Sequence, residues 1–327
     1  PFGPFVYVIS SMRIMPRHKL ETAFEEGRFE TAWGVDTPPD SLVASGPFVV
    51  AAYVPNQSLT LKPNPWYYKV DAKKRRLPYL DELVWVFVPD QNAERIVFGN
   101  GESDAYAARA EDFQSLKAGE AAGGYTVHDL GMEFGSNFFW FNQNQEKNDR
   151  GKPVVDPVKS SWFRNRNFRL AVAHAVDRET MARNVYFGQA EPLYGPVPPV
   201  NKLWYNPNAA QYAYDLDRAR AILAEAGFVD RNGDGVVEDP EGHKGSFRLF
   251  TNASNKERVA SAAILADDLK KIGFEIQFTP LEFNGLIAAI QSTFDYDMIM
   301  LGATGGTPPD PVMMVNTLRS SGRTHFW

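Results

Sequence analysis

The residues whose spacing best suits chemistry lie in one short stretch, DRNGDGVVEDPE, from Asp230 to Glu241. Oxygen-bearing side chains recur along it at calcium-loop spacing: Asp230, Asn232, Asp234, Glu238 and Glu241. A hard cation such as Ca²⁺ is wrapped by oxygen ligands at alternate loop positions, with a glycine at the sharp bend, where Gly235 stands. The spacing therefore predicts a structural calcium site.

A polar turn is the alternative interpretation of the same loop. A helical pattern precedes it and a strand pattern follows it, whereas helices flank an EF-hand loop on both sides. The Asn-Gly and Asp-Gly pairs that begin at Asn232 and Asp234 are also frequent in tight turns. Both interpretations give the loop a structural role, and the sequence leaves the choice between them open.

No other group of residues has the spacing of a catalytic site. The chain has no nucleophile elbow, no phosphate-binding loop, no HExxH pair and no dinucleotide-binding glycine motif. It contains no cysteine, which excludes disulfides and thiolate catalysis, and its five histidines are scattered. We therefore predict a protein that is not an enzyme and requires no cofactor, with structural Ca²⁺ as the one candidate ion. A calcium-dependent hydrolase is the alternative.

A second stretch, LGATGGTPPDP, could bind a ligand through its backbone. It is rich in glycine and proline, carries one charge at Asp310, and follows FDYDMIM, which has the pattern of a buried strand. A segment so poor in side chains lets a ligand approach main-chain N–H and C=O groups closely. We predict that six of its residues contact ligand: Gly302, Ala303, Thr304, Gly305, Gly306 and Thr307.

The elements around these two stretches alternate between helix and strand. Strands are predicted at 246–251, 274–279 and 296–301, and a helix at about 255–272 lies between the first two. This β-α-β-α-β order predicts an open α/β sheet. Ligands of such sheets bind beyond the carboxyl ends of the strands, which is where the glycine-rich stretch begins.

The first half of the chain is predicted to be β-rich. Two alternating apolar runs between Gly46 and Asn64 surround a VPNQ turn, and this pattern is typical of a hairpin. A chain of 327 residues is too long for one ordinary core. We therefore expect two lobes, residues 1–135 and residues 136–327.

The composition narrows the class of protein. An apolar fraction of 44% and a charged fraction of 23% are typical of globular proteins. The net charge is -6 with the two signs mixed, so no basic face is available for nucleic acid. No apolar run approaches the ~18–20 residues that span a bilayer.

Several stretches, taken in order, resemble one family: the bacterial extracellular solute-binding proteins, family 5, which are the dipeptide- and oligopeptide-type substrate-binding proteins of ABC transporters. The stretches are ASGPFVVAAYVPNQSLTLKPNPWYY with RLPYLDEL, FGNGESDAY, FRNRNFRLAVAHAVDRETM, DLDRARAILAEAGFVDRNGDGVVE, and TPLEFN with FDYDMIMLGATGGTPPDP. The similarity extends over most of the chain. It covers a middle-to-late part of the family, so we interpret the chain as a truncated fragment.

The resemblance implies a fold and a function. The fold is α/β, of the periplasmic-binding-protein type (type II), with two lobes that each hold a mixed β-sheet flanked by helices, lobe one being incomplete here. The function is the substrate-binding component of an ABC-type uptake transporter, which binds a peptide-like or oligosaccharide-like solute between its lobes and delivers it to a membrane permease. A homologue that acts as a sensor is the alternative. We expect a monomer, periplasmic or extracellular, with a lipid anchor as one option.

The resemblance also implies ligand-binding residues. Trp140, in NFFWFNQNQ, and Phe283, in PLEFNG, match aromatic positions of the family's cleft, with core packing as the alternative. In peptide-binding members an aspartate of the glycine-rich stretch pairs with the free amino group of the peptide. Gly306 or Thr307 stands at that place here, and Glu282, next to Phe283 on the adjacent loop, is the candidate for a carboxylate that could take its place. We therefore expect a neutral or blocked solute to fit better than a peptide with a free amine.

Overall fold

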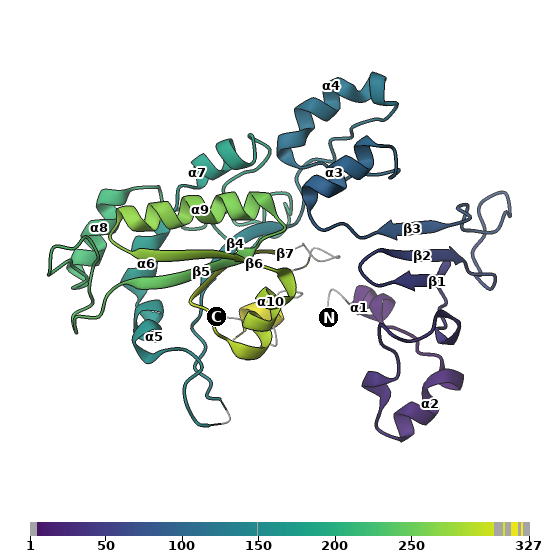
Figure 1. The fold of residues 1–327 in the computed structure, drawn as a ribbon, viewed down its shortest axis with the longest axis horizontal. Coiled ribbons are helices and arrows are strands. Elements are labelled where there is room, and N and C mark those ends of the chain that lie inside the picture. The colour runs from purple at the N-terminus through teal and green to yellow at the C-terminus, as the bar shows by residue number, and fades with distance from the viewer. Residues whose placement is uncertain (1–4, 149, 304–309, 311–314, 320–321, 323–327) are drawn as a thin grey trace. The chain divides into compact units, whose positions relative to one another are not determined.

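The computed structural model describes residues 5–148, 150–303, 310, 315–319 and 322. The chain forms two compact units, Pro1–Glu94 and Arg95–Trp327 (Figure 1). The lobe boundary expected between residues 135 and 136 falls inside the second unit and stays a prediction.

The first unit contains a three-stranded antiparallel sheet. Its strands pair in the order β1 (Phe48–Val54), β2 (Ser58–Pro63) and β3 (Leu83–Val86). The predicted hairpin is confirmed: the N–H of Gln57 donates to the carbonyl of Val54 at 3.0 Å, and Asn56 between them has a φ of 59°. Asparagine tolerates this left-handed conformation better than most residues. The connection is therefore tight enough to make the two strands antiparallel neighbours.

Short helices accompany this sheet. They are α1 (Phe5–Ser11), α2 (Arg17–Glu25) and two 3₁₀ turns (Phe29–Thr31 and Pro39–Ser41), while α3 (Gln91–Gly99) crosses the boundary between the units. In the part of the chain that the structure describes, no helix combines the length and the apolar character needed to cross a membrane.

The second unit is built on a mixed four-stranded sheet. Its strands are β4 (Ser136–Phe141), β5 (Ser246–Asn252), β6 (Glu275–Leu281) and β7 (Met298–Ala303), in the spatial order β4-β7-β5-β6. Strand β5 pairs in parallel with both β6 and β7, whereas β4 pairs with β7 antiparallel. The three strands predicted for this region therefore share one sheet, as expected.

The helices that flank this sheet begin and end where the sequence provides caps. The Asn255 side chain accepts a hydrogen bond from the N–H of Arg258 at 2.8 Å, which starts α9 (Lys256–Lys271), and Gly273 follows that helix with a φ of 92°. Asp215 caps α8 (Leu216–Glu225) in the same way. The other helices are α4 (Phe113–Gly123), α5 (Pro157–Arg164), α6 (Arg166–His174), α7 (Arg178–Thr180), α10 (Phe283–Ala288) and α11 (Val315–Leu318).

Residues 165–186 have the apolar periodicity of one continuous helix, but the structure interrupts it. Helix α6 ends at His174, and the Asp177 side chain accepts a hydrogen bond from the N–H of Thr180 at 2.9 Å, which starts α7. A five-residue π turn follows at Met181–Val185. An aspartate that bonds the backbone locally offers the chain an alternative to the continuous helical ladder.

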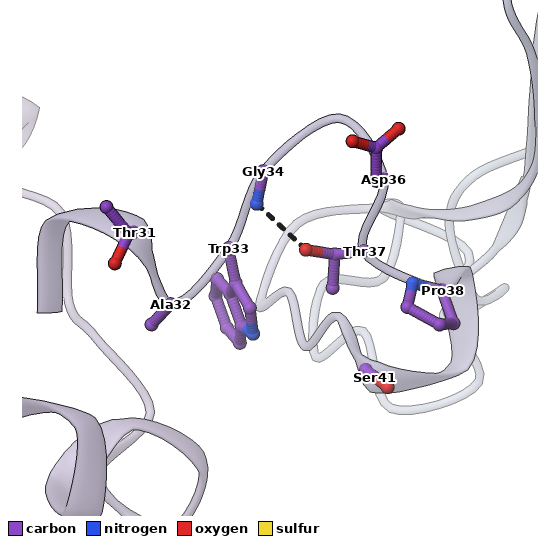
Figure 2. A pocket seen from close by; sticks show the side chains of 8 residues that line it. All are labelled: Thr31, Ala32, Trp33, Gly34, Asp36, Thr37, Pro38 and Ser41. Carbon is purple, nitrogen blue, oxygen red and sulfur yellow. Dashed lines mark hydrogen bonds between the residues drawn. The ribbon is translucent and has the colours of Figure 1, made fainter. Parts of the chain in front are cut away.

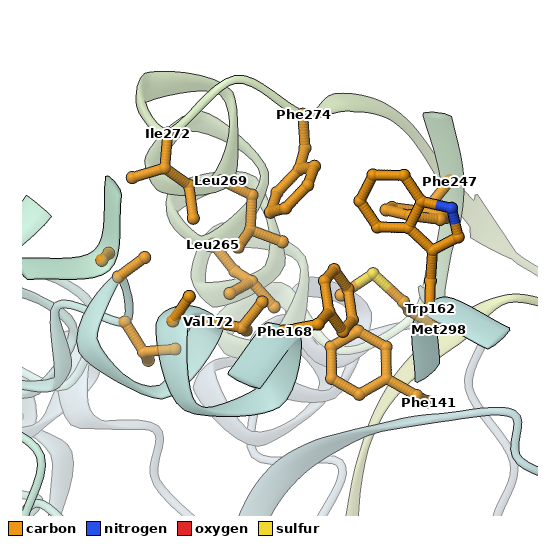
Figure 3. Packing of buried hydrophobic residues seen from close by; sticks show 14 of the residues in the cluster. Phe141, Trp162, Phe168, Val172, Phe247, Leu265, Leu269, Ile272, Phe274 and Met298 are labelled. Atoms are coloured by element: carbon orange, nitrogen blue, oxygen red, sulfur yellow. The ribbon is translucent and has the colours of Figure 1, made fainter. Parts of the chain in front are cut away.

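The core of the second unit covers both faces of its sheet. The larger cluster joins aromatic side chains from α5, α6, β4, β5 and the residue before β6 with leucines of α9. Figure 3 shows Phe141, Trp162, Phe168, Phe247, Phe274, Leu265 and Leu269, and Phe163 belongs to the same cluster. The smaller cluster lies on the other face and includes Leu286 of α10. Figure 1 shows α9 and α10 on opposite sides of the sheet. Each large apolar side chain buried here stabilises the fold by about 1.5–3 kcal/mol.

Candidate ligand-binding edge

The carboxyl ends of three parallel strands meet at one edge of the second sheet. Strand β5 ends at Asn252, β6 at Leu281 and β7 at Ala303. Because β4 runs antiparallel to β7, the start of β4 lies at the same edge, where Asn137 pairs with Gly302. The edges of open α/β sheets bind ligands at this end of the strands. The first two residues of the predicted ligand-binding set, Gly302 and Ala303, lie at this edge.

Gly302 makes room for a neighbouring side chain at this edge, and its predicted contact with ligand stays a prediction. A Cβ at this position would lie 2.5 Å from Oδ1 of Asn137 and would overlap the guanidinium of Arg258. The missing side chain therefore makes room for Arg258. Ala303 is exposed at the end of β7. The other four residues of the predicted set, Thr304, Gly305, Gly306 and Thr307, lie outside the described residues.

Arg258 is the residue at this edge that the sequence analysis missed. Its Nε donates to Oδ1 of Asn137 at 2.8 Å, and its Nη1 donates to Oδ1 of Asn252 at 3.1 Å. Asn137 is held in turn, since its Nδ2 donates to the hydroxyl of Tyr186 at 2.9 Å. Two amide oxygens from two different strands thus fix the guanidinium against the backbone of Gly302.

The charge on Arg258 is only weakly compensated. Burial lowers the pKa of its guanidinium, while the charges of Glu257 and Glu133 act in the opposite direction. Within the described residues no carboxylate lies within 4.0 Å of Arg258. Burial also raises the pKa of Tyr186, so this hydroxyl stays neutral. The edge can therefore offer hydrogen-bond donors and a positive charge.

Phe283 and Glu282 stand beyond the end of β6. The Phe283 side chain is 47% exposed and begins α10, so it is free to contact a ligand, and that contact stays a prediction. The Glu282 carboxylate caps the same helix: its Oε2 accepts from the N–H groups of Asn284 at 2.8 Å and Gly285 at 3.3 Å. The Glu282 carboxylate is thus engaged in capping α10.

Trp140 lies in the core. Its side chain is 7% exposed, its Nε1 donates to the hydroxyl of Tyr296 at 3.2 Å, and the two rings meet edge to face at 6.5 Å. Strand alternation is the reason, because Phe139 and Phe141 face the larger cluster while Trp140 faces the smaller one. This placement is the core packing that the sequence left as the alternative. Stacking on a ligand would require the ring to leave this packing.

The loop between α8 and β5 brings together three of the four carboxylates predicted to bind calcium. Carboxylate oxygens of Asp230, Asp234 and Glu238 lie within 4.8 Å of one another. Glu241 is grouped differently, with Asp239 and His243. The chain reverses over residues 239–243, where the N–H of Asp239 donates to the carbonyl of His243 at 2.9 Å, and this turn carries Glu241 away from the other carboxylates.

The same loop also has the hydrogen bonds of a polar turn. Asp230 accepts from the N–H groups of Gly233 and Gly235, at 2.7 and 2.8 Å. The Asn232 amide donates to Glu238 at 2.6 Å, and Lys244 forms an ion pair with Asp234. These bonds show how the loop holds its shape, and the three convergent carboxylates fit a calcium ion. The calcium prediction therefore stays open.

The first unit has a shallow pocket of about 510 Å³ (Figure 2). It is lined by Thr31, Ala32, Trp33, Gly34, Asp36, Thr37, Pro38 and Ser41. The N–H of Gly34 donates to Oγ1 of Thr37 at 2.8 Å across the turn. None of the residues predicted to bind ligand lines this pocket. The lining contains hydroxyl groups but no histidine or lysine to activate one of them, so the pocket suggests no catalytic chemistry.

Comparison with known proteins identifies relatives of the whole chain. The family described as bacterial extracellular solute-binding proteins, family 5 Middle, matches residues 1–325. A probable ABC transporter-binding protein of Deinococcus radiodurans is 31% identical over 291 residues, which cover 86% of this chain and 48% of that protein. A periplasmic alpha-galactoside-binding protein of Rhizobium meliloti is 27% identical, over 74% of this chain and 36% of its own length.

The oligopeptide-binding protein AppA of Bacillus subtilis is a relative in both sequence and structure. It is 28% identical over 306 residues, which cover 92% of this chain and 50% of AppA. Its structure in complex with a nonapeptide has a TM-score of 0.76 at 26% identity, covering 99% of this chain and 59% of that one. The chain thus spans about half the length of the curated relatives that it matches. The type II binding-protein fold expected from the sequence is confirmed.

Proposed function

Because this chain belongs to family 5 of the bacterial extracellular solute-binding proteins, we propose that it is the substrate-binding component of an ABC-type uptake transporter. The observation that carries this proposal is the match of the family over residues 1–325, and the parallel strands whose carboxyl ends meet at one edge support it, since open α/β sheets bind ligands at such edges. At that edge, Arg258, Asn137 and Asn252 present polar groups beside the last residues of β7. The transporter function concerns the whole protein, of which this chain matches about half.

The proposed solute is peptide-like or oligosaccharide-like. AppA is named for oligopeptides, and the relative from Rhizobium meliloti is named for alpha-galactosides, which supports both classes. A protein with this role works outside the cytoplasmic membrane, so the proposal places it in the periplasm or at the cell surface, with a lipid anchor as one means of attachment. Its partner would be the permease of the same transporter, and it would act as a monomer.

The proposal assigns no chemical reaction to this protein. Three relatives with a printed role are named as binding proteins, and none of them is named as a hydrolase. The strand edge offers hydrogen-bond donors and an exposed aromatic ring at Phe283, which suit binding. A solute-binding role therefore needs no nucleophile and no general base.

Calorimetry on the native gene product tests this function. The panel is a nonapeptide with neutral side chains and raffinose, an alpha-galactoside. We expect saturable heat with one of them, and a matching rise in melting temperature. A solute at one hundred times its Kd stabilises the folded state by about 2.7 kcal/mol. Absence of both heat and thermal shift with every member of the panel would contradict the proposed function.

A further inference from the structure

Arg258 has N–H groups without acceptors, among the described residues, at the carboxyl edge of the sheet. A guanidinium carries five N–H donors. One of them, on Nε, donates to Asn137, and one on Nη1 donates to Asn252. Within the part of the chain that the structure describes, the remaining donors have no acceptor. Because two amides hold the plane of the group, these donors are fixed in direction before any ligand arrives.

The two partners of Arg258 position its charge without neutralising it. Asn137 and Asn252 are neutral amides, whereas arginine inside a folded domain is usually paired with a carboxylate. Glu133 and Glu257 are close enough to attract Arg258, yet neither approaches within 4.0 Å. Arg248 of this unit pairs with Asp297. Arg169 and Arg178 lack a carboxylate too, but their guanidinium groups donate to main-chain carbonyls, whereas the partners of Arg258 are two side-chain amides at the strand edge. The positive charge of Arg258 therefore has no carboxylate partner among the described residues, and an anionic group of a ligand would supply one.

Arg258 also lies where a solute would meet it. Gly302, which its guanidinium covers, is the second-last residue of β7, and the predicted ligand-binding stretch starts there. A glycine at this position is what lets the guanidinium lie against the strand end. Binding an amine at this edge would need a negative charge, whereas Arg258 is positive. The carboxylate considered earlier for that role, Glu282, instead caps α10.

We propose that Arg258 binds an acidic group of the solute, a carboxylate, through the donors that Asn137 and Asn252 leave free. This inference rests on the proposed solute-binding function and specifies the end of the solute that faces the edge. Nε and one N–H of Nη1 are already engaged, so a carboxylate would accept from the remaining N–H groups of Nη1 and Nη2. Hydrogen bonds between a guanidinium and a carboxylate are charge-assisted and therefore strong. The carboxylate can come from the C-terminus of a peptide or from an acidic sugar, and the test separates these sources.

The test compares acidic and neutral forms of matched solutes on the native gene product. The pairs are the neutral nonapeptide with a free C-terminal carboxylate or a C-terminal amide, and a galacturonic acid trimer or a galactose trimer. We expect the acidic member of one pair to bind at least ~10-fold more tightly than its neutral partner, because hydrogen bonds to charged groups are the stronger ones. Equal affinities within both pairs would overturn the inference while leaving the proposed function intact.

Substitution then assigns the preference to one residue. Arg258→Gln should weaken binding of the preferred acidic solute by roughly 10–100-fold and leave its neutral partner within about 2-fold. Arg258→Lys keeps the charge but loses the planar set of donors that the two amides hold in place, so its effect should fall between those of wild type and Arg258→Gln. Arg220→Gln is the matched control, since this exposed arginine of α8 donates to the carbonyl of Lys271 away from the edge. Equal weakening of acidic and neutral solutes by Arg258→Gln would show a purely structural role and overturn the inference.

These measurements distinguish failure of the proposed solute-binding function from failure of the role proposed for Arg258. If the wild-type protein binds none of the four matched solutes and does not bind raffinose, the proposed transport function is contradicted. If it binds neutral forms as tightly as acidic ones, only the role of Arg258 is contradicted. The wild-type comparison involves no variant, so it decides the question even if Arg258→Gln unfolds.

Discussion

Nε of Arg258 donates a 2.8 Å hydrogen bond to Oδ1 of Asn137, a residue 121 positions earlier in the chain. This bond joins the first turn of α9 to the first residues of β4. It passes over Gly302, where a side chain would collide with both partners. The edge that could bind a ligand is thus held together by a long-range contact that only a glycine permits.

Gly302→Ala should therefore destabilise the second unit. The added methyl group must displace Arg258 or Asn137, and overpacking of this kind costs about 1–3 kcal/mol. Urea unfolding followed by circular dichroism measures the change. Gly285→Ala is the control, because nothing lies within 4 Å of a Cβ there and Gly285 lies inside α10, so it should leave the stability unchanged or raise it by up to about 1 kcal/mol. Equal effects of the two substitutions would contradict the packing described for Gly302.

Leu265→Ala should cause a larger loss. This side chain is 0% exposed at the centre of the larger core cluster, and removing it leaves a cavity beneath α9. The free energy of unfolding should fall by about 2–5 kcal/mol. Leu203→Ala, at a side chain that is 82% exposed, is the matched control and should change it by no more than about 0.5 kcal/mol. A loss of unfolding free energy for Leu265→Ala no larger than that for Leu203→Ala would contradict the burial of Leu265 in this core.

Calcium should raise the melting temperature if the loop at residues 230–238 binds it, because the ion would bind only the folded state. Thermal unfolding in millimolar CaCl₂, with MgCl₂ in parallel, measures the shift. Asp230→Asn removes one of the three convergent carboxylates and should abolish the shift. Asp217→Asn, at an exposed carboxylate outside the loop, should preserve it. If CaCl₂ produced no shift of the melting temperature in the wild type, the calcium site would be contradicted and only the polar-turn interpretation would remain.

Stability at alkaline pH should depend on Tyr106. Burial, together with the 2.6 Å hydrogen bond that its hydroxyl donates to Asp112, raises the pKa of Tyr106 to about 12. A tyrosine titrates near pH ~10 when unfolded. Because the folded-state pKa is the higher one, this stabilisation is complete below pH ~10 and is lost as the pH rises toward 12.

Urea midpoints measured between pH 9 and 12 check this dependence, with the pH range taken from those two pKa values. Tyr106→Phe should lose less stability than wild type over that range, since the group that titrates is gone. Tyr68→Phe is the control, because Tyr68 is exposed and should leave the wild-type profile unchanged. Parallel profiles for wild type and Tyr106→Phe would refute the assignment.

The sequence by itself determined the local elements and the family. Asp215 and Asn255 mark the starts of α8 and α9, and the alternation of apolar residues marks the hairpin of β1 and β2, because caps and periodicity depend on neighbours a few positions away. The order of strands and helices then limited the second unit to an open α/β sheet. Its carboxyl edge could be anticipated on the same ground.

Only the tertiary structure decided what each side chain does at that edge. The pairing of β4 with β7 brings Asn137 to Gly302 and turns Trp140 into the core, and no local pattern encodes this register. The reversal of the chain at residues 239–243 separates Glu241 from Asp230, although their spacing matches a calcium loop. Contacts between residues far apart in the sequence depend on how whole elements pack, and packing is a property of the assembled core.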